Sequence, residues 1–384
     1  MIGEVTNDAI YLDHAATSWP KPDEVLQQIT RAFGSLTANA GRSGYRASVN
    51  SARMVFETRR RLAELLGVGR WENLVLTRGC TEGLNLVIKG LLVPGDRVAA
   101  TPMEHNSVMR PLMRLVRERG ITVETLPADP LGRIDLEAAQ RLAKSKRFAL
   151  VVVVHASNVN GVVQDLAGLR DVFAQTPLLV DAAQTAGVLP IQIEHERIDF
   201  LACSAHKGLL GPTGVGACYL AADYEVLPLC EGGTGSRSES LDHPDFRPDG
   251  YEAGTLNLHG IAGTYGALLG AQQRGLLGDG KRQLSKMLID GLGEIPGVAV
   301  HSPRDGSALC VSLTIPGLKP DEIAARLEME YGVLCRPGLQ CAPAAHRHLG
   351  TFPAGTVRLS PGWRNTAADV EVALRGIHSV AKSI

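Results

Sequence analysis

The stretch Asp199-Phe200-Leu201-Ala202-Cys203-Ser204-Ala205-His206-Lys207-Gly208-Leu209-Leu210-Gly211-Pro212-Thr213-Gly214-Val215-Gly216 places one lysine between a short apolar strand and a loop that carries four glycines. Lys207 comes just after a run that is typical of a buried strand. Burial there would lower the pKa of its amine and free the amine for attack. Such a lysine suits a Schiff base with a carbonyl cofactor. A lysine that only caps a strand end is the alternative interpretation, and the rest of the chain has to decide between the two.

The length and charge of the chain restrict its class. Its 384 residues exceed one typical core, so we expect two domains with room for a buried site between them. The net charge is −1, from 39 basic and 40 acidic residues, and the sequence has no basic stripe that would neutralise phosphates. These features argue against a nucleic-acid partner.

Signals for secretion, membrane insertion and disulfides are missing from the sequence. Residues 1–10 lack a basic segment followed by an apolar run, and no window approaches the length of a membrane span. We therefore expect a soluble, cytoplasmic protein with no membrane partner. The seven cysteines are odd in number and form no CxxC pair, which argues against a disulfide framework. Most of them are expected to be small buried apolar residues.

From residue 73 onward, apolar strand patterns alternate with helical ones. Continuous apolar runs such as Leu150–Val154 suit strands that are buried on both faces, so we expect a largely parallel sheet covered by helices. The result is an α/β domain of about 200 residues. The expected strands are 73–77, 97–101, 121–126, 148–154, 178–180 and 200–203, and the expected helices between them are 81–92, 106–117, 136–143 and 166–173.

The patterns on either side of this domain are mostly helical. Pro20 and Pro22 open a helix that runs through about Phe33, and a longer helix is expected over 47–66. A long helix rich in small residues, 258–275, leads into a second unit. The expected strands of that unit are 308–314, 332–335 and 356–359, and its expected helices are 320–330 and 366–381.

Unusual polar residues occur where the expected strands end. The turn Arg78-Gly79-Cys80-Thr81-Glu82 opens a helix, whose free N–H groups and Thr81 hydroxyl would bind phosphate. A simple N-cap is the alternative reading of that turn. His105 follows strand 97–101, and Asn158 follows run 148–154. Because ligand groups gather at the carboxyl ends of parallel strands, these side chains are expected to meet at one rim.

Asp181 and Gln184 follow strand 178–180 at the same rim. A carboxylate directly after Leu178-Leu179-Val180 is costly to bury unless it meets a cation, and a protonated pyridine nitrogen would be such a cation. A lysine for an aldehyde, an aspartate for a pyridinium and a helix start for a phosphate are together what pyridoxal 5′-phosphate needs.

These motifs, taken in order from Tyr11-Leu12-Asp13 to Arg358, resemble the class V aminotransferase-fold enzymes of the cysteine desulfurase family, and most nearly the SUF-type and selenocysteine-lyase branch. The resemblance implies the type I fold of pyridoxal-phosphate-dependent transferases, with a mostly parallel seven-stranded sheet in the large domain. It also implies three parts: an N-terminal segment, 1–20, that packs on the small domain; a large cofactor-binding domain, 21–257; and a smaller α/β domain, 258–384, that carries the catalytic cysteine.

The family motifs assign a role to each of the matching residues. The resemblance implies that Lys207 forms the Schiff base, that Asp181 pairs with the pyridinium nitrogen and that His105 stacks on the ring as a catalytic group. The other cofactor contacts implied by the resemblance are Gln184 to the ring hydroxyl, Asn158 beside the cofactor, and Thr81, Ser204 and His206 to the phosphate.

The sequence departs from the family at Cys80, where relatives commonly have threonine. A thiol is a weaker donor than a hydroxyl, so Cys80 is expected to contribute mainly its backbone N–H. Thr255, in Tyr251-Glu252-Ala253-Gly254-Thr255, matches the threonine that reaches the phosphate of the neighbouring subunit. The resemblance thus implies a homodimer with active sites near the subunit interface.

The last motif surrounds Cys341, in Cys335-Arg336-Pro337-Gly338-Leu339-Gln340-Cys341-Ala342-Pro343. Pro343 suits the first turn of a helix, and a helix N-terminus with Arg336 nearby favours a thiolate at Cys341. A structural cysteine, or a metal site with His346 and His348, are the alternatives, although the spacing fits no zinc pattern. We expect no metal.

The family's catalytic cysteine corresponds to Cys341, and Arg358 corresponds to the arginine that grips the substrate carboxylate. Arg336 and Asn158 are also expected to contact the substrate. The activity implied is a desulfurase that converts L-cysteine to L-alanine and leaves a persulfide on Cys341, with a possible acceptor protein for the sulfur. Selenocysteine lyase and ordinary class V aminotransferase are the alternatives among enzymes, and a scaffold protein that lost the chemistry is the alternative outside them.

Overall fold

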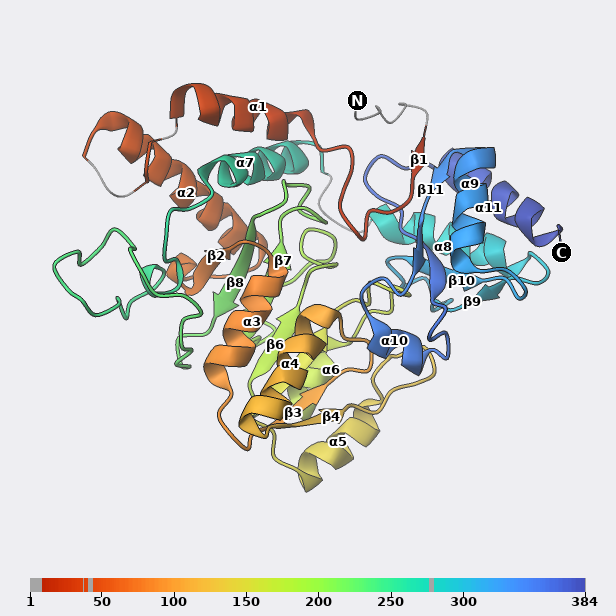
Figure 1. Ribbon diagram of the computed structural model, residues 1–384, viewed down its shortest axis with the longest axis horizontal. Helices are drawn as coiled ribbons and strands as arrows, with labels where there is room; N and C mark the ends of the chain where they lie inside the picture. The colour runs from red at the N-terminus through yellow and green to blue at the C-terminus, as the bar shows by residue number, and fades with distance from the viewer. Residues whose placement is uncertain (1–8, 37, 41–43, 276–279, 384) are drawn as a thin grey trace.

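The structure is a computed structural model that describes residues 9–36, 38–40, 44–275 and 280–383. Its central element is a seven-stranded sheet with the order β2-β8-β7-β6-β5-β3-β4 (Figure 1). The bounds are β2 Leu74–Thr77, β3 Arg97–Ala100, β4 Thr122–Thr125, β5 Leu150–Val154, β6 Leu178–Asp181, β7 Phe200–Ser204 and β8 Gly216–Leu220. Five neighbouring strands of this sheet, β7, β6, β5, β3 and β4, are parallel to one another. The expected fold class, α/β with a mostly parallel seven-stranded sheet, is confirmed.

The seventh strand, β8, is one that the periodicity did not predict. It pairs antiparallel with both β2 and β7, so it lies inside the sheet rather than at its edge. Its sequence, Gly-Ala-Cys-Tyr-Leu, begins with small residues that carry little strand signal. The glycine loop after Lys207 returns the chain alongside β7, and tertiary pairing rather than local propensity makes this segment a strand.

Helices cover both faces of this sheet, because alternate strand residues point into two different cores. Val151 and Val153 of β5 belong to the core with α2 (Arg46–Leu65), α5 (Leu136–Ser145), α6 (Leu166–Val172) and α7 (Leu258–Gln273). Leu150 and Val152 belong to the core with α3 (Cys80–Leu91) and α4 (Asn106–Arg119). A strand that contributes to both cores has to be apolar throughout, as the run 150–154 is.

The C-terminal unit is built on a smaller antiparallel sheet, with the order β12-β13-β10-β9. Helices α8, α9 and α11 enclose its core. The bounds are α8 Gly280–Gly293, β9 Ala299–Val300, β10 Val311–Thr314, α9 Pro320–Tyr331, β11 Val333–Leu334, β12 Arg336–Gly338, α10 Pro343–His348, β13 Thr356–Leu359 and α11 Ala367–Ala381. The sequence did not predict α8, β9 or β12. The two strands are too short for a periodic pattern, and α8 has a glycine at each end.

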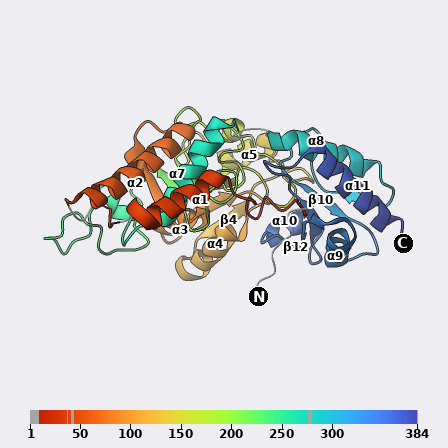
Figure 2. The ribbon, with the colours of Figure 1, turned by 90° about the horizontal axis from the view of Figure 1, so that it is seen from above.

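The N-terminal segment crosses to this smaller unit. β1 (Ile10–Tyr11) pairs in parallel with β11, and Leu12 lies in the core of the C-terminal unit. Residues 1–8 of the predicted segment 1–20 lie outside the described residues. Helix α7, which begins the predicted small domain, packs instead against α1 (Asp23–Arg31) and α2, on the side of the large sheet (Figures 1 and 2). The domain boundaries therefore remain predictions.

The described helices include none that is both long enough and apolar enough to cross a membrane. Between the large sheet and the C-terminal unit, the carboxyl ends of β5, β6 and β7 face residues of β12 and β13, and a cavity of about 230 Å³ lies there.

Candidate active site

The cavity collects nearly all of the residues that the sequence singled out. Those that line it are Cys80, Thr81, His105, Asn158, Asp181, Gln184, Ser204, His206, Lys207, Arg336 and Arg358. They come from separate strand ends, helix starts and the C-terminal unit, so only the folded chain brings them together. Cys341 and Thr255 do not line it.

Lys207 and Asp181 both line the cavity. Burial lowers the pKa of the Lys207 amine, while the negative charge of Asp181 opposes that shift. Asp181 ends β6 and is in register with Ala202 of β7. Its side chain is buried, and its Oδ1 accepts a hydrogen bond from the N–H of Ala183 at 2.9 Å. A lysine with a lowered pKa and a nearby carboxylate suits covalent binding of a carbonyl cofactor.

Cys80 makes two contacts that the sequence did not reveal. Its thiol lies 3.2 Å from Oδ1 of Asp181 and can donate to it. Its backbone N–H, expected to be free for a phosphate, donates to Oγ of Ser204 at 2.8 Å. Burial and the charge of Asp181 raise the pKa of the Cys80 thiol well above its usual value, so this sulfur is a hydrogen-bond donor rather than a thiolate.

Thr81 and His105 lie at the starts of the two helices on one face of the sheet. Oγ1 of Thr81 is 2.8 Å from Oγ of Ser107. His105 is the N-cap of α4, and its Nδ1 accepts a hydrogen bond from the N–H of Ser107. Burial lowers the pKa of His105, against the opposing charge of Asp181, so the imidazole is neutral at pH 7. Because Nδ1 is an acceptor, the proton of this neutral ring belongs on Nε2.

Three buried polar atoms of the lining residues have no hydrogen-bond partner among the residues that the structure describes: Oδ1 of Asn158, Nδ1 of His206 and Nε of Arg358. Buried polar atoms are rarely left unpaired, and such atoms call for a ligand or water. Burial first, and then the charges of Lys207 and Lys21, lower the pKa of His206 to about 4. The cavity therefore offers unpaired polar atoms to an incoming polar molecule.

Gln184 and Lys21 connect the cavity to the N-terminal segment. Nε2 of Gln184 donates to the carbonyl of Ala15 at 2.9 Å. The amine of Lys21, a residue that the sequence analysis missed, donates to the carbonyl of His206 at 2.9 Å. Burial lowers the pKa of Lys21 to about 8. Ala15 and Ala16 of segment 9–21 thus form one wall of the cavity, which Lys207, in the turn after β7, also lines.

Arg358 is the most deeply buried cation of the site, with 1% of its side chain exposed. It forms an ion pair with Asp13, and its Nη1 donates to the carbonyl of Asn158 at 2.8 Å. Asp13 was not among the predicted site residues, although it ends the motif Tyr11-Leu12-Asp13. Asp13 forms a parallel bridge with Ser360, two residues after Arg358, and this bridge brings the two charges together. Such long-range pairing cannot be predicted from a single sequence.

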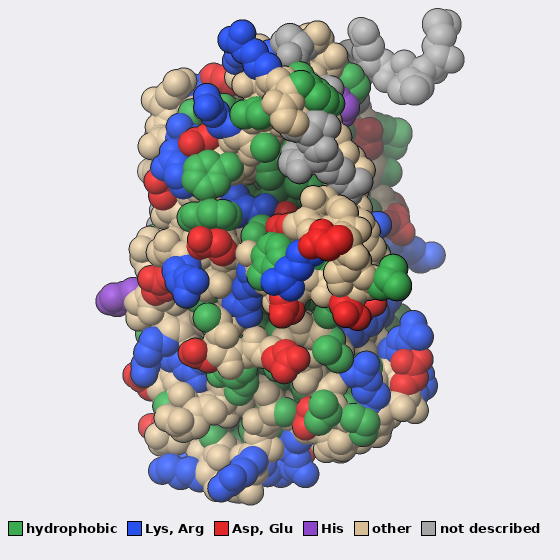
Figure 3. Space-filling view, turned by 90° about the vertical axis from the view of Figure 1, so that its left-hand side faces the viewer, with side chains coloured by type: hydrophobic (Ala, Val, Ile, Leu, Met, Phe, Trp, Pro, Cys, Tyr) green, Lys and Arg blue, Asp and Glu red, His purple; other side chains and the backbone are tan. Residues whose placement is uncertain are grey.

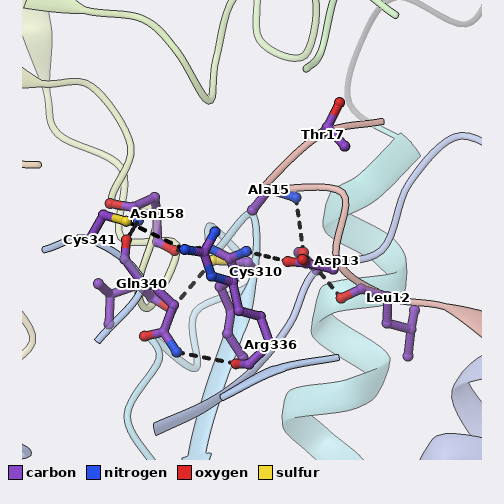
Figure 4. A network of polar contacts seen from close by, with 12 residues as sticks. Leu12, Asp13, Ala15, Thr17, Asn158, Cys310, Arg336, Gln340 and Cys341 are labelled. Atoms are coloured by element: carbon purple, nitrogen blue, oxygen red, sulfur yellow. Dashed lines mark hydrogen bonds and ion pairs between the residues drawn. The ribbon is translucent and has the colours of Figure 1, made fainter. Parts of the chain in front are cut away.

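The side chain of Cys341 is exposed, and its neighbour Gln340 lines the cavity. Nη2 of Arg336 donates to the sulfur of Cys341 at 3.4 Å, as Figure 4 shows. Cys341 precedes α10, whose N-cap is Ala342. The two histidines considered as metal ligands turn elsewhere: His346 bonds to Thr351 and Gln340, and His348 bonds to the carbonyl of Asp129. No group of three or more potential metal ligands is present among the described residues.

Thr255 lies in a separate pocket of about 320 Å³, which Arg78, Gly214 and Asn257 also line. Within one chain it therefore does not meet Lys207. Glu252, three residues earlier in the sequence, forms a buried ion pair with Arg59 of α2 and accepts a hydrogen bond from the N–H of Leu76. These contacts hold the segment 251–255 against the large domain, and the role of Thr255 across an interface remains a prediction.

Comparisons with known proteins agree with this geometry. The sequence model of the family described as aminotransferase class-V matches residues 10–372. A probable cysteine desulfurase of Pyrococcus abyssi is 32% identical over 397 residues, which cover 99% of this chain and 96% of that protein. A cysteine desulfurase of Haloferax volcanii is 30% identical, with 90% and 83% covered.

Two solved structures are similar over almost their whole length. The apo structure of a cysteine desulfurase from Thermococcus onnurineus has a TM-score of 0.91 and 32% identity, with 99% of this chain and 96% of that chain covered. The cysteine desulfurase CsdA of Escherichia coli has a TM-score of 0.84 and 27% identity, with 98% and 95% covered. The likeness thus extends through both sheets and includes the segment with Cys341.

Proposed function

The chain belongs to the aminotransferase class-V family, and on that premise we propose that it is a pyridoxal 5′-phosphate enzyme that converts L-cysteine to L-alanine and leaves the sulfur as a persulfide on Cys341. The observation that carries the proposal is the arrangement of one cavity. A lysine with a lowered pKa and a buried aspartate line it together, and an arginine that also lines it contacts an exposed cysteine.

The residues present fit the cofactor. Lys207 would bind its aldehyde, Asp181 would hold its ring nitrogen protonated, and neutral His105 would lie on its ring. The unpaired Oδ1 of Asn158 and Nδ1 of His206 are free to meet its polar groups. Thr81, Ser204 and His206 would hold the phosphate. When bound, the cofactor withdraws electrons from the α-carbon of the amino acid attached to it.

The two arginines suit the carboxylate of the substrate. Arg336 and Arg358 both line the cavity. Nη1 of Arg358 donates to Asn158 and Nη2 to Asp13, while its Nε has no partner among the described residues. Arg336 is only partly buried. A carboxylate between them would receive charge-assisted hydrogen bonds, which fix the orientation of the amino acid.

Proton transfer falls to Lys207. Because burial lowers the pKa of its amine, more of the amine is neutral near pH 7 than in a solvated lysine. A neutral amine can take the α-proton and return it to carbon. Neutral His105, with its proton on Nε2, offers a second donor at the same wall.

Cys341 is the proposed sulfur acceptor. Its thiolate would attack the sulfur of the substrate and form an S–S bond while the bond between Cβ and sulfur breaks. The electron pair of the broken bond goes to Cβ, which takes a proton to give alanine. Arg336 donates to the Cys341 sulfur and stabilises its negative charge before the attack. A thiol, either small or on an acceptor protein, is then required to take the sulfur away.

We also propose that two copies of the chain share their sites, with Thr255 reaching the phosphate of the neighbour. The face over α2 supports this, because it exposes the apolar side chains of Tyr45, Val49 and Phe56. Hydrophobic side chains appear among charged ones over that side of the molecule in Figure 3. Analytical ultracentrifugation should find a dimer. A monomer that binds the cofactor as tightly as the dimer does would contradict the sharing of sites.

The activity is tested by incubating the purified, cofactor-loaded protein with L-cysteine and measuring alanine. Borohydride reduction and peptide mapping should place the pyridoxyl group on Lys207. Equal amounts of alanine and of thiol-releasable sulfur are expected. Labelling of a different lysine, or the absence of alanine, would contradict the proposal.

A further inference from the structure

The residue before the proposed sulfur acceptor has an unusual conformation. Gln340 has a φ of 42° and Cys341 has a φ of 61°, so two successive residues with side chains lie in the left-handed region. Few residues other than glycine adopt it, and such strain persists only where the surroundings enforce it. The side chain of Gln340 is 2% exposed, although it adjoins an exposed cysteine.

The amide of Gln340 uses its full hydrogen-bonding capacity. Its Nε2 donates to the carbonyls of Arg336 at 3.2 Å and Thr356 at 3.0 Å. Its Oε1 faces Nε2 of His346 at 2.9 Å and Oγ1 of Thr356 at 3.4 Å. An amide has two N–H donors and two acceptor lone pairs, and all four are engaged here. One side chain thereby joins the start of the cysteine loop, strand β13 and helix α10.

His346 and Thr351 complete this arrangement. Burial lowers the pKa of His346 to about 4, so its ring is neutral and has one donor and one acceptor nitrogen. Because Oε1 of Gln340 can only accept, Nε2 of His346 donates to it. Nδ1 must then accept from Oγ1 of Thr351, at 2.7 Å. Thr351 thus selects the tautomer of His346 that holds Gln340.

The backbone of the same two residues is bound to the large sheet. The carbonyl of Gln340 accepts Nδ2 of Asn158 at 2.6 Å, and the carbonyl of Cys341 accepts the N–H of Asn106, the first residue of α4, at 2.9 Å. Figure 4 shows Gln340 below Cys341 and Asn158, with Arg336 beside them. The loop is therefore fixed by contacts on both sides of the cavity, and the Cys341 sulfur is set beside Arg336.

We propose that Gln340, supported by His346 and Thr351, is a positioning residue that holds the Cys341 sulfur in line for attack. The inference rests on the proposed function, in which Cys341 accepts the sulfur. Gln340 lines the cavity, but its amide is bonded to Arg336, Thr356 and His346 and is assigned no part in the chemical step. It enforces the left-handed backbone from which the thiol projects, and a misplacement of about 1 Å in such a site can cost about 100-fold in rate.

The variant that tests this is Gln340→Met, which keeps the length of the side chain and removes its hydrogen bonds. The matched control is Gln164→Met. Gln164 is also buried, accepts the N–H of Ile134 and donates to the carbonyl of Gly132, but does not contact the cysteine loop. Both variants remove a buried glutamine amide, so a general loss of stability should affect them alike.

Three measurements on the cofactor-loaded proteins separate positioning from stability. The affinity for L-cysteine, read from the cofactor absorbance, should be unchanged in both variants. The single-turnover rate of persulfide formation should fall about 10- to 100-fold in Gln340→Met and stay within about twofold in the control. The rate at which iodoacetamide alkylates Cys341 should also fall in Gln340→Met, because the thiol loses its contact with Arg336.

Thr351→Val provides a milder second variant if Gln340→Met does not fold. It removes the hydroxyl that selects the His346 tautomer and should slow the same step and the same alkylation by a smaller factor. Rates in Gln340→Met or Thr351→Val that match the Gln164→Met control would overturn the inference and leave the proposed function intact. If the parent protein made no alanine from L-cysteine, the function would fail, and the alkylation rates would still decide the positioning role.

Discussion

The ion pair between Asp13 and Arg358 gives a prediction whose size follows from burial. Arg358 has 1% of its side chain exposed and Asp13 has 21%. In Asp13→Asn the carbonyl oxygen can still accept a hydrogen bond, but the charge that neutralises the guanidinium is gone. Removal of one partner of a buried pair costs about 3–5 kcal/mol, and the partial exposure of Asp13 places this pair at the low end, about 3 kcal/mol.

The chain contains a matched pair at the surface. Asp171 pairs with Arg197 at 2.8 Å, and their side chains are 77% and 61% exposed. Asp171→Asn should therefore cost less than about 1 kcal/mol, because water and salt screen an exposed pair. Urea unfolding of the cofactor-loaded proteins, followed by circular dichroism, measures both changes.

The difference between the two variants tests the reasoning. We expect Asp13→Asn to lower the free energy of unfolding by about 2 kcal/mol more than Asp171→Asn does. Equal losses in the two variants would show that Arg358 is solvated or neutralised in another way. The ion pair would then have no role in holding segment 9–21 against the C-terminal unit.

Two further predictions concern charge in the core of the large domain. Asp181→Asn should keep bound cofactor but lower kcat for L-cysteine at least about 100-fold, since electrostatic contacts of this kind contribute roughly 3 kcal/mol; near-normal kcat would mean that Asp181 is structural. His155 is buried, and desolvation lowers its pKa from 6.5 to about 4. Between about pH 6.5 and pH 4, His155 is therefore protonated in the unfolded chain but neutral in the folded chain. Its contribution makes stability fall as the pH drops from about 6.5 to 4, by about 3 kcal/mol, and His155→Gln should flatten this part of the stability curve; an unchanged curve would contradict the assignment.

Much of the large domain was predictable because its strands bear a strong local signal. The run Leu150–Val154 is apolar at every position, which indicates a strand buried on both faces, and it is β5. β8 was not predictable in this way, since Gly216 and Ala217 carry little strand preference and its place depends on pairing with β2 and β7. Helix α8, between glycines, was missed for a similar reason.

The site residues were also predictable where the local sequence carried a signal, and not where their placement depended on tertiary contacts. Residues at or just beyond the carboxyl end of a strand, such as Asp181 and Lys207, were predictable because the carboxyl ends of parallel strands converge. Asp13 was not, because its partner Arg358 is 345 residues away in the sequence. Gln340 was not, because its contact with Thr356 depends on where the loop after β12 returns to β13. The change at Cys80 was visible in the sequence, but its contact with Asp181 required the two strand ends to be placed side by side.

The fate of the substrate sulfur tests the central claim most directly. We expect mass spectrometry after one turnover with L-cysteine to find one extra sulfur atom on the peptide with Cys341. Cys341→Ala should form no alanine from L-cysteine, yet keep part of its activity on L-selenocysteine, because selenium leaves carbon more easily and needs less help from a thiolate. Burial raises the pKa of the Cys335 thiol to about 12, which makes it a poor substitute. Alanine formation from L-cysteine by Cys341→Ala at the parent rate would contradict the account.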